Sequence, residues 1–255
     1  MGSGSKVRPK ILGFVCNWCC YGGADLCGVS RFQYPPYIRL IRVMCSARVD
    51  MAHVFLALST GQDGVFIGGC HLNDCHYITN GNYDAFSMVS ICNKILGHIG
   101  VNPDRLRLEW VSAGEGIRFA NIMNEFGAQI AKLGPLGQSE GIDEQVLKFR
   151  LEAAAKLVPY IKLVQTERMS VPVRTEEEYH KFFTSEEFNR LFEETIAEKL
   201  AIGQIIALLQ KGPLATPEIS EALGLTPSEV SRFLISSSRQ KFVRYDEGLK
   251  RYALA

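Results

Sequence analysis

The chain has 255 residues, and its 28 Lys and Arg residues against 27 Asp and Glu residues give a formal net charge of +1. This balance provides no general electrostatic attraction to nucleic acid or to an anionic membrane. Hydrophobic residues make up 47% of the chain and charged residues 22%, which supplies a sizeable core for one or two domains and excludes disordered and collagen-like classes.

The first half alternates short apolar runs with segments of helical period. Runs rich in branched residues predict buried strands over residues 10–15, 38–44, 64–69 and 105–111. Apolar residues at helical spacing predict helices over 52–59, 83–99 and 116–133. The Gly-rich stretch 17–36 fits either a long loop or a short helix. Alternation of strands and helices predicts an α/β fold with an open parallel sheet of about four strands and right-handed crossovers.

The second half has a different pattern, and Gly134-Pro135-Leu136-Gly137 marks the change. Residues 138–198 are mainly helical and charged, and we expect a linker or docking segment there. From residue 199, three short helices and a hairpin over 242–254 predict a winged helix-turn-helix. The sequence thus predicts three parts, namely an α/β domain over 1–137, a helical segment over 138–198 and a winged-helix domain over 199–255.

All eight cysteines lie before residue 93, at positions 16, 19, 20, 27, 45, 70, 75 and 92. A secreted domain stapled by disulfides is smaller, with cysteines spread along its length. The start of the chain shows no apolar export signal, and no run reaches the roughly 18 apolar residues that span a bilayer. We therefore expect a cytoplasmic, reducing setting without a membrane span, in which the clustered cysteines serve a metal centre or thiol chemistry.

Three cysteines come directly after predicted strands. Cys16, Cys45 and Cys70 each end such a run, so in a parallel sheet they meet at one edge, with neighbouring strands about 4.8 Å apart. Open α/β sheets usually bind ligands outside the carboxyl ends of their strands. Cys19 and Cys75 lie in loops that continue over the same edge. Four thiolates suffice for a 2Fe–2S or a 4Fe–4S cluster or for tetrahedral zinc.

The other thiol and imidazole groups favour ordinary roles. Cys20, Cys27 and Cys92 are expected to pack in the core, as small cysteines often do. His71 and His76 are expected to form hydrogen bonds or to lie at the surface. The chain has no Gly-x-Gly-x-x-Gly after the first strand, no Gly-x-Ser-x-Gly, no His-Glu-x-x-His and no P-loop. Without a convincing acid–base pair, the sequence predicts a non-catalytic protein that transfers electrons.

Four ordered strings within residues 10–130 carry a family resemblance: GFVCNWCCYGGADLCGVSRFQYPP, IRLIRVMCSARVD, DGVFIGGCHLNDCHY and RLRLEWVSAGEG. They are similar to the iron-sulfur (delta) subunit of methyl-viologen-reducing, F420-non-reducing hydrogenase. The resemblance implies a 2Fe–2S cluster. It also implies two partners. One is a flavoprotein like the A subunit of heterodisulfide reductase, which performs flavin-based electron bifurcation, and the other is an oxidoreductase such as a hydrogenase or formate dehydrogenase.

The five motif cysteines of that family correspond to Cys16, Cys19, Cys45, Cys70 and Cys75. One is surplus to four-ligand coordination, and we take Cys16, Cys45, Cys70 and Cys75 as the ligands and Cys19 as the spare. Short family members end near the first domain, so the resemblance leaves residues 140–255 unexplained.

The predicted winged helix has a weak basic footprint, with seven Lys and Arg against five Asp and Glu over 201–255. DNA-binding domains usually carry a stronger one, so DNA binding is disfavoured and protein docking favoured. The sequence predicts an electron-transfer subunit that relays electrons between an oxidoreductase and a heterodisulfide reductase-like bifurcating complex. The alternatives are an iron-sulfur redox-sensing DNA-binding regulator and a zinc-stabilised scaffold.

Overall fold

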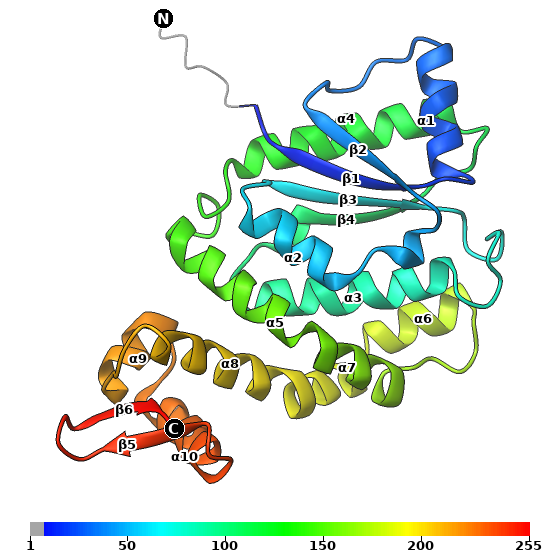
Figure 1. The fold of residues 1–255 in the computed structure, drawn as a ribbon. Helices are drawn as coiled ribbons and strands as arrows, with labels where there is room; N and C mark the ends of the chain where they lie inside the picture. Colours follow the sequence, from blue (N-terminus) through cyan, green and yellow to red (C-terminus); the bar gives the residue numbers. More distant parts are fainter. Residues whose placement is uncertain (1–7) are drawn as a thin grey trace, which may run out of the picture. The chain divides into compact units, whose positions relative to one another are not determined.

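The computed structural model describes residues 8–255. Its sheet has four strands, β1 (Ile11–Cys16), β2 (Ile38–Val43), β3 (Gly64–Gly69) and β4 (Leu106–Trp110). The strand order is β2-β1-β3-β4, and all three pairings are parallel. The predicted strands and the open parallel sheet are confirmed (Figure 1).

The register brings the carboxyl ends of the strands level. Cys16 at the end of β1 lies opposite Val43 at the end of β2. On the other side of β1, Val15 lies opposite Gly68, and Gly69 in turn lies opposite Trp110 on β4. Loops that leave these ends therefore start from one edge of the sheet.

Helices cover both faces of the sheet (Figure 1). On one face lie α1 (Cys20–Val29) and α4 (Gly116–Leu133), and on the other lie α2 (Met51–Ser59) and α3 (Asn82–His98). The stretch that fitted either a loop or a helix thus forms α1 between two loops. Short 3-10 turns, η1 (Ser46–Arg48) and η2 (Pro103–Arg105), follow β2 and precede β4.

The core between the sheet and α4 is built from the buried face of each element. Ile11, Val15 and Phe66 of the strands pack with residues of α4 that recur at helical spacing: Phe119, Ile122, Met123, Phe126 and Ile130. Burying a large apolar side chain contributes about 1.5–3 kcal/mol, so this face fixes α4 on the sheet.

A polar network closes the amino end of the sheet. The Arg105 guanidinium is fully buried and donates to both Glu140 carboxylate oxygens, at 2.6 and 3.0 Å, and to the Asp63 carbonyl oxygen at 2.9 Å. The Asp63 carboxylate accepts the backbone N–H groups of Lys10, at 2.8 Å, and Leu136, at 3.1 Å. Every charge of this network has a partner in the chain itself.

The second half is helical and ends in a hairpin. It comprises α5 (Glu144–Arg168), α6 (Glu176–Phe183), α7 (Glu186–Phe192), a π-helical turn η3 (Glu193–Ala197), α8 (Glu198–Leu209), α9 (Thr216–Leu223), α10 (Pro227–Arg239) and the antiparallel strands β5 (Val243–Asp246) and β6 (Arg251–Leu254). The chain divides into two compact units, residues 1–155 with 170–185, and residues 156–169 with 186–255.

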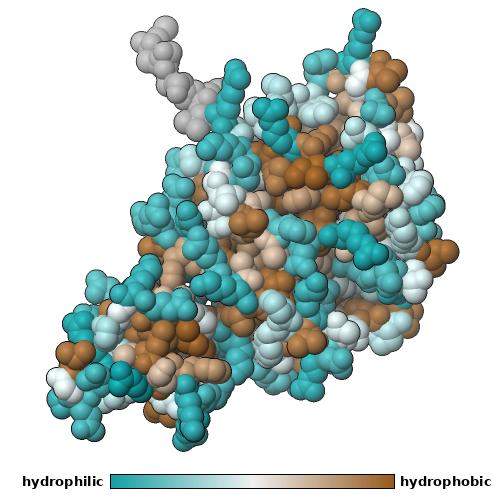
Figure 2. All heavy atoms as spheres, in the orientation of Figure 1, coloured by the Kyte–Doolittle hydropathy of each residue, from teal (hydrophilic) through white to brown (hydrophobic). Residues whose placement is uncertain are grey.

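Hydrophilic side chains cover much of the visible surface, and a hydrophobic patch lies over the sheet where β2 runs (Figure 2). Ile41 on this edge strand is 43% exposed. Within residues 8–255, no helix is both long enough and apolar enough to span a bilayer.

Candidate metal centre at the carboxyl end of the sheet

The five cysteines singled out by the sequence all lie at the carboxyl end of the sheet or in loops that leave it. Cys16 is the last residue of β1, Cys70 follows β3 directly, and Cys45 precedes η1. Cys19 is the residue before α1, and Cys75 lies in the loop between β3 and α3. Cys16, Cys45 and Cys70 are buried, Cys19 and Cys75 are half-buried, and all five are free thiols.

The sulfurs meet in pairs. The Sγ atoms of Cys16 and Cys70 are 3.6 Å apart, close to the roughly 3.8 Å expected of two thiolates on one tetrahedral metal with metal–sulfur bonds of about 2.3 Å. Cys45 and Cys75 lie close enough to affect each other's ionisation, and so do Cys19 and Cys70. In the described part of the chain, no group of three or more Cys, His, Asp or Glu side chains is placed to hold a metal ion.

The environment of Cys16 favours the thiolate. The hydrogen bond from Cys70 lowers the pKa of Cys16 from 9.0 to about 6, against the opposing effect of burial, and the backbone N–H groups of Trp18, Cys19 and Ser46 lower it further. The same hydrogen bond, together with burial, raises the pKa of Cys70. Since the thiolate is the metal ligand, this pair offers one ready ligand and one that releases a proton on binding.

Burial is the main influence on the pKa values of Cys45 and Cys19. It raises the pKa of Cys45 to about 11, and the nearby Cys75 adds to the rise, although the Ala47 backbone N–H opposes it. Burial also raises the pKa of Cys19. As anions, such neighbouring thiolates repel each other, and a cation that binds between them makes their ionisation favourable.

The Ser46 hydroxyl is a buried polar group at this end of the sheet. Its oxygen makes no hydrogen bond within residues 8–255, and it lies next to Cys45 and close to Gly69. Leaving such a group unsatisfied costs about 1–3 kcal/mol. Sequence reasoning missed Ser46, since only its position after Cys45 could have drawn attention to it. The orphaned donor and the thiol set together fit a bound group that accepts hydrogen bonds.

The start of α3 holds the cysteine loop, which we define as residues 70–81. The Asn82 side-chain amide donates to the carbonyl oxygens of Cys70 and His71, at 3.0 and 2.6 Å. The Tyr83 hydroxyl donates to the side-chain oxygen of Asn73 at 2.7 Å. A Cβ atom at Gly81 would lie 2.5 Å from the Cys75 sulfur, so only glycine lets the chain pass so close to this thiol.

Both histidines next to the motif cysteines have the hydrogen-bonding or surface role expected of them. The Nε2 atom of His71 lies 2.6 Å from a carboxylate oxygen of Glu115 and links the cysteine loop to the start of α4. The exposed His76 ring stacks on Trp18, with ring centroids 4.0 Å apart. This stack joins the loop after β1 to the loop after β3.

Cys20, Cys27 and Cys92 are all buried. Cys20 packs against Gly68, and the Cys27 thiol donates to the Phe32 carbonyl oxygen at 3.4 Å. Cys92 lies on α3, where its sulfur is 3.7 Å from the Met88 sulfur. Burial raises the pKa of each of the three. They behave as packing residues with protonated thiols at neutral pH.

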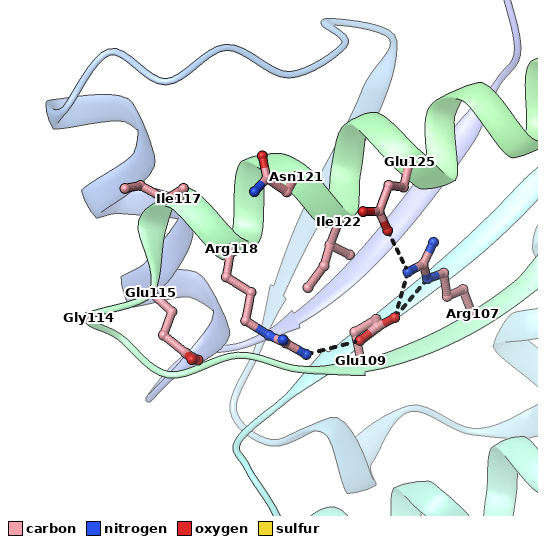
Figure 3. A pocket seen from close by; sticks show the side chains of 9 residues that line it. All are labelled: Arg107, Glu109, Gly114, Glu115, Ile117, Arg118, Asn121, Ile122 and Glu125. Atoms are coloured by element: carbon pink, nitrogen blue, oxygen red, sulfur yellow. Dashed lines mark hydrogen bonds and ion pairs between the residues drawn. The ribbon is translucent and has the colours of Figure 1, made fainter.

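A cleft of about 610 Å³ runs along β4 and α4. Four of its charged side chains pair with one another: Arg107 contacts Glu109 and Glu125, at 2.7 and 3.2 Å, and Arg118 contacts Glu109 at 3.5 Å (Figure 3). The fifth, Glu115, bonds His71. Because the charged side chains that line this cleft are already paired, the thiols at the sheet end are the chemically distinctive site.

An open parallel sheet whose carboxyl end carries clustered, largely buried thiols defines a cysteine-bearing α/β domain. Comparison with known proteins gives the family. The family model described as methyl-viologen-reducing hydrogenase, delta subunit, matches residues 11–134. The chain is 49% identical over 128 residues to the iron-sulfur D subunit of F420-non-reducing hydrogenase from Archaeoglobus profundus, a match covering 50% of this chain and 93% of that protein. The chain belongs to this delta-subunit family, as its cysteine strings predicted.

Two further relatives show how the domain is used elsewhere. The chain is 49% identical over 140 residues to the iron-sulfur D subunit of the vhc F420-non-reducing hydrogenase from Methanococcus voltae; the match covers 54% of this chain and 96% of that protein. It is 50% identical over 129 residues to the A subunit of the ferredoxin/F(420)H(2)-dependent CoB-CoM heterodisulfide reductase from Methanosarcina acetivorans. That match covers 51% of this chain but only 16% of the relative. There, the matching region is a small part of a much larger protein.

Proposed function

We propose that the chain is an electron-transfer subunit that carries a 2Fe–2S cluster at the carboxyl end of its sheet. It relays electrons between an oxidoreductase, such as a hydrogenase or formate dehydrogenase, and a heterodisulfide reductase-like flavin-based bifurcating complex. Cys16, Cys45, Cys70 and Cys75 are the proposed ligands, with Cys19 as the spare thiol. When bound, the cluster supplies one-electron chemistry.

The pairing of the sulfurs is the observation that carries this proposal. A 2Fe–2S cluster takes two protein ligands on each of its two irons. Cys16 with Cys70, and Cys45 with Cys75, form two such pairs. A single tetrahedral zinc would instead need four sulfurs around one point. Cys19 also contacts Cys70 and is the natural substitute within the first pair.

The residues around the thiols suit an anionic group. The backbone N–H groups of Trp18 and Ala47 point at Cys16 and Cys45, and the unpartnered Ser46 hydroxyl is available to donate. Donors of this kind stabilise the reduced, more negative state and raise the reduction potential. Burial of three of the thiols limits water access, which keeps these interactions strong.

The surroundings of the centre also suit a docking partner. Three large apolar side chains in the loops that follow β1, β2 and β3 are exposed: Trp18 by 42%, Met44 by 55% and Ile78 by 87%. Exposed apolar groups that gather in one region mark interaction sites. In one relative this domain is part of the A subunit of a heterodisulfide reductase, which supports a flavoprotein of that kind as the partner at this end.

We propose that residues 199–255 form a winged-helix domain that docks a protein partner. Helices α8, α9 and α10 precede the β5–β6 hairpin, and Leu214 pairs with Tyr252 of the hairpin. On α10, Glu229 caps the helix start through Thr226, which places a negative charge at the start of the predicted recognition helix. This acidic helix start supports protein docking over DNA binding.

Anaerobic purification followed by iron and acid-labile sulfide analysis tests the proposal. We expect two irons and two sulfides per chain, and an EPR signal that appears on dithionite reduction. Zinc at one per chain without sulfide would contradict the cluster. A cluster together with tight, salt-dependent binding to a specific DNA sequence would favour a redox-sensing regulator instead. Co-purification with a flavoprotein, and electron transfer to it, would support the relay.

A further inference from the structure

A short piece of the C-terminal extension belongs to the cysteine-bearing unit. Residues 170–185, which we name the clasp segment, form α6 and its flanks and group with residues 1–155. The family match ends at residue 134. The Archaeoglobus profundus relative is matched over 93% of its length, and the small remainder is too short to supply the linking helix and a counterpart of this segment.

The clasp segment grips the cysteine loop through Arg174. This guanidinium donates to the carbonyl oxygens of Ile78 and Thr79, and lies 3.3 Å from a carboxylate oxygen of Asp84 at the start of α3. One side chain therefore bonds both ends of the short stretch that follows Cys75. Charge-assisted hydrogen bonds are stronger than neutral ones, so these contacts restrict the path of the loop.

Aromatic packing holds the other side of the same stretch. The Tyr179 ring on α6 lies 4.7 Å from the Tyr83 ring and 5.6 Å from the Phe86 ring, measured between centroids. Phe183 lies 5.9 Å from Phe86 in the same way. Tyr83, Phe86 and Tyr179 form a small core of their own. Since Tyr83 also bonds Asn73, this core reaches the cysteine loop directly.

We propose that the clasp segment is an intramolecular brace that holds Cys75 in position for metal binding, with Arg174 and Tyr179 as positioning residues. The proposal rests on the proposed function only in assigning Cys75 as a ligand. The proposal itself is that contacts from the clasp segment make the loop between Cys75 and α3 open less often. Cys75 is half-buried, unlike Cys16, Cys45 and Cys70, so it depends most on such support.

The loop can be tested in the cluster-free protein. We expect Arg174→Ala and Tyr179→Ala to raise the rate of Cys75 alkylation by iodoacetamide by about three- to tenfold, as loss of contacts worth about 1 kcal/mol allows. Peptide mass spectrometry follows Cys75 and, as an internal reference, the fully buried Cys92. The matched control is Lys181→Ala on α6, where the side chain is 74% exposed and the rate should not change.

Two outcomes would overturn the brace. The first is an unchanged Cys75 rate in both variants. The second is equal acceleration at Cys75 and Cys92, because that would show general loss of stability. Arg174→Lys provides a rescue test, since it keeps the charge toward Asp84 and should restore at least half of the protection.

A second readout uses the reconstituted protein. We expect Arg174→Ala to change the EPR line shape of the reduced cluster and to shorten its half-life with an iron chelator about threefold or more, with Arg174→Lys intermediate. Identical spectra and half-lives in the three proteins would contradict the positioning role. If the wild-type protein takes up no iron and sulfide while Cys75 still becomes reactive in Arg174→Ala, the proposed function fails and the loop brace stands.

Discussion

The two ends of the same parallel sheet are built on opposite principles. At the amino end, Arg105, Glu140 and Asp63 satisfy one another and the neighbouring backbone. At the carboxyl end, thiols crowd together, burial raises the pKa of Cys45, and the Ser46 hydroxyl has no partner. One end is complete within the chain, whereas the other presents groups that a bound cation or cluster would satisfy.

This difference separates stability from chemistry along the strands. Substitutions at the amino end should lower the stability of the fold and leave metal binding intact in the folded fraction. Substitutions at the carboxyl end should weaken metal binding and leave the fold intact. In the same way, ligands of open α/β sheets usually bind beyond the carboxyl ends of the strands. Four experiments test this contrast.

Cys70→Ser should abolish cluster binding. Cys70 interacts with both Cys16 and Cys19, so its loss removes a proposed ligand and the hydrogen bond that lowers the pKa of Cys16. We expect iron and sulfide content to fall at least tenfold, while the cluster-free protein keeps its far-ultraviolet circular dichroism. Cys92→Ala, which alters a buried thiol on α3, should retain the cluster. Full iron and sulfide content in Cys70→Ser would remove this residue from the ligand set.

Glu140→Gln should lower the free energy of unfolding of the cysteine-bearing unit by about 3–5 kcal/mol, the usual cost of breaking a buried ion pair. Arg105 is fully buried and would lose its counter-charge. Urea unfolding followed by tryptophan fluorescence reports on this unit, because Trp18 and Trp110 are the two tryptophans of the chain. Glu125→Gln, where the carboxylate is 65% exposed, should cost less than about 1 kcal/mol.

Lowering the pH should reduce the stability of the fold through the Arg105–Glu140 ion pair. Burial alone would raise the pKa of Glu140, but the hydrogen bond and charge of Arg105 prevail and lower it from 4.5 to about 2. Since the unfolded chain binds this proton more readily, the stabilisation is present above pH 4.5 and disappears as the pH falls toward 2. Glu140→Gln should flatten the stability profile across this window. Parallel profiles for the two proteins would contradict the assignment.

Ser46→Ala should affect the stability of the cluster-free protein and the reduction potential of the reconstituted protein differently. Because the hydroxyl is buried without a partner, its removal should leave the stability of the cluster-free protein unchanged or raise it by up to about 1 kcal/mol. In the reconstituted protein the reduction potential should fall by about 20–60 mV, as loss of one hydrogen bond to the reduced cluster implies. Ser59→Ala, which removes a hydroxyl bonded to Leu56, should destabilise the protein without changing the potential.

Local sequence patterns were enough to predict most elements of the sheet domain and the location of the candidate site. Short apolar runs and helical periods are local signals, so they predicted the four strands and α2, α3 and α4 closely. Because parallel strands end at one edge, the positions of Cys16, Cys45 and Cys70 after such runs also predicted that they meet. The cysteine strings predicted the family, which the comparisons then confirmed.

Tertiary structure decided everything that depends on contacts between distant residues. No periodic pattern in the sequence predicts three of these features. They are the contact between Cys16 and Cys70, the unpartnered Ser46 hydroxyl among the described residues, and the bonds of Arg174 to residues 78–84. The buried Arg105–Glu140 pair is likewise invisible, since both residues are of types usually found at the surface. Local patterns specify where an element lies, but burial and partners are properties of the packed whole.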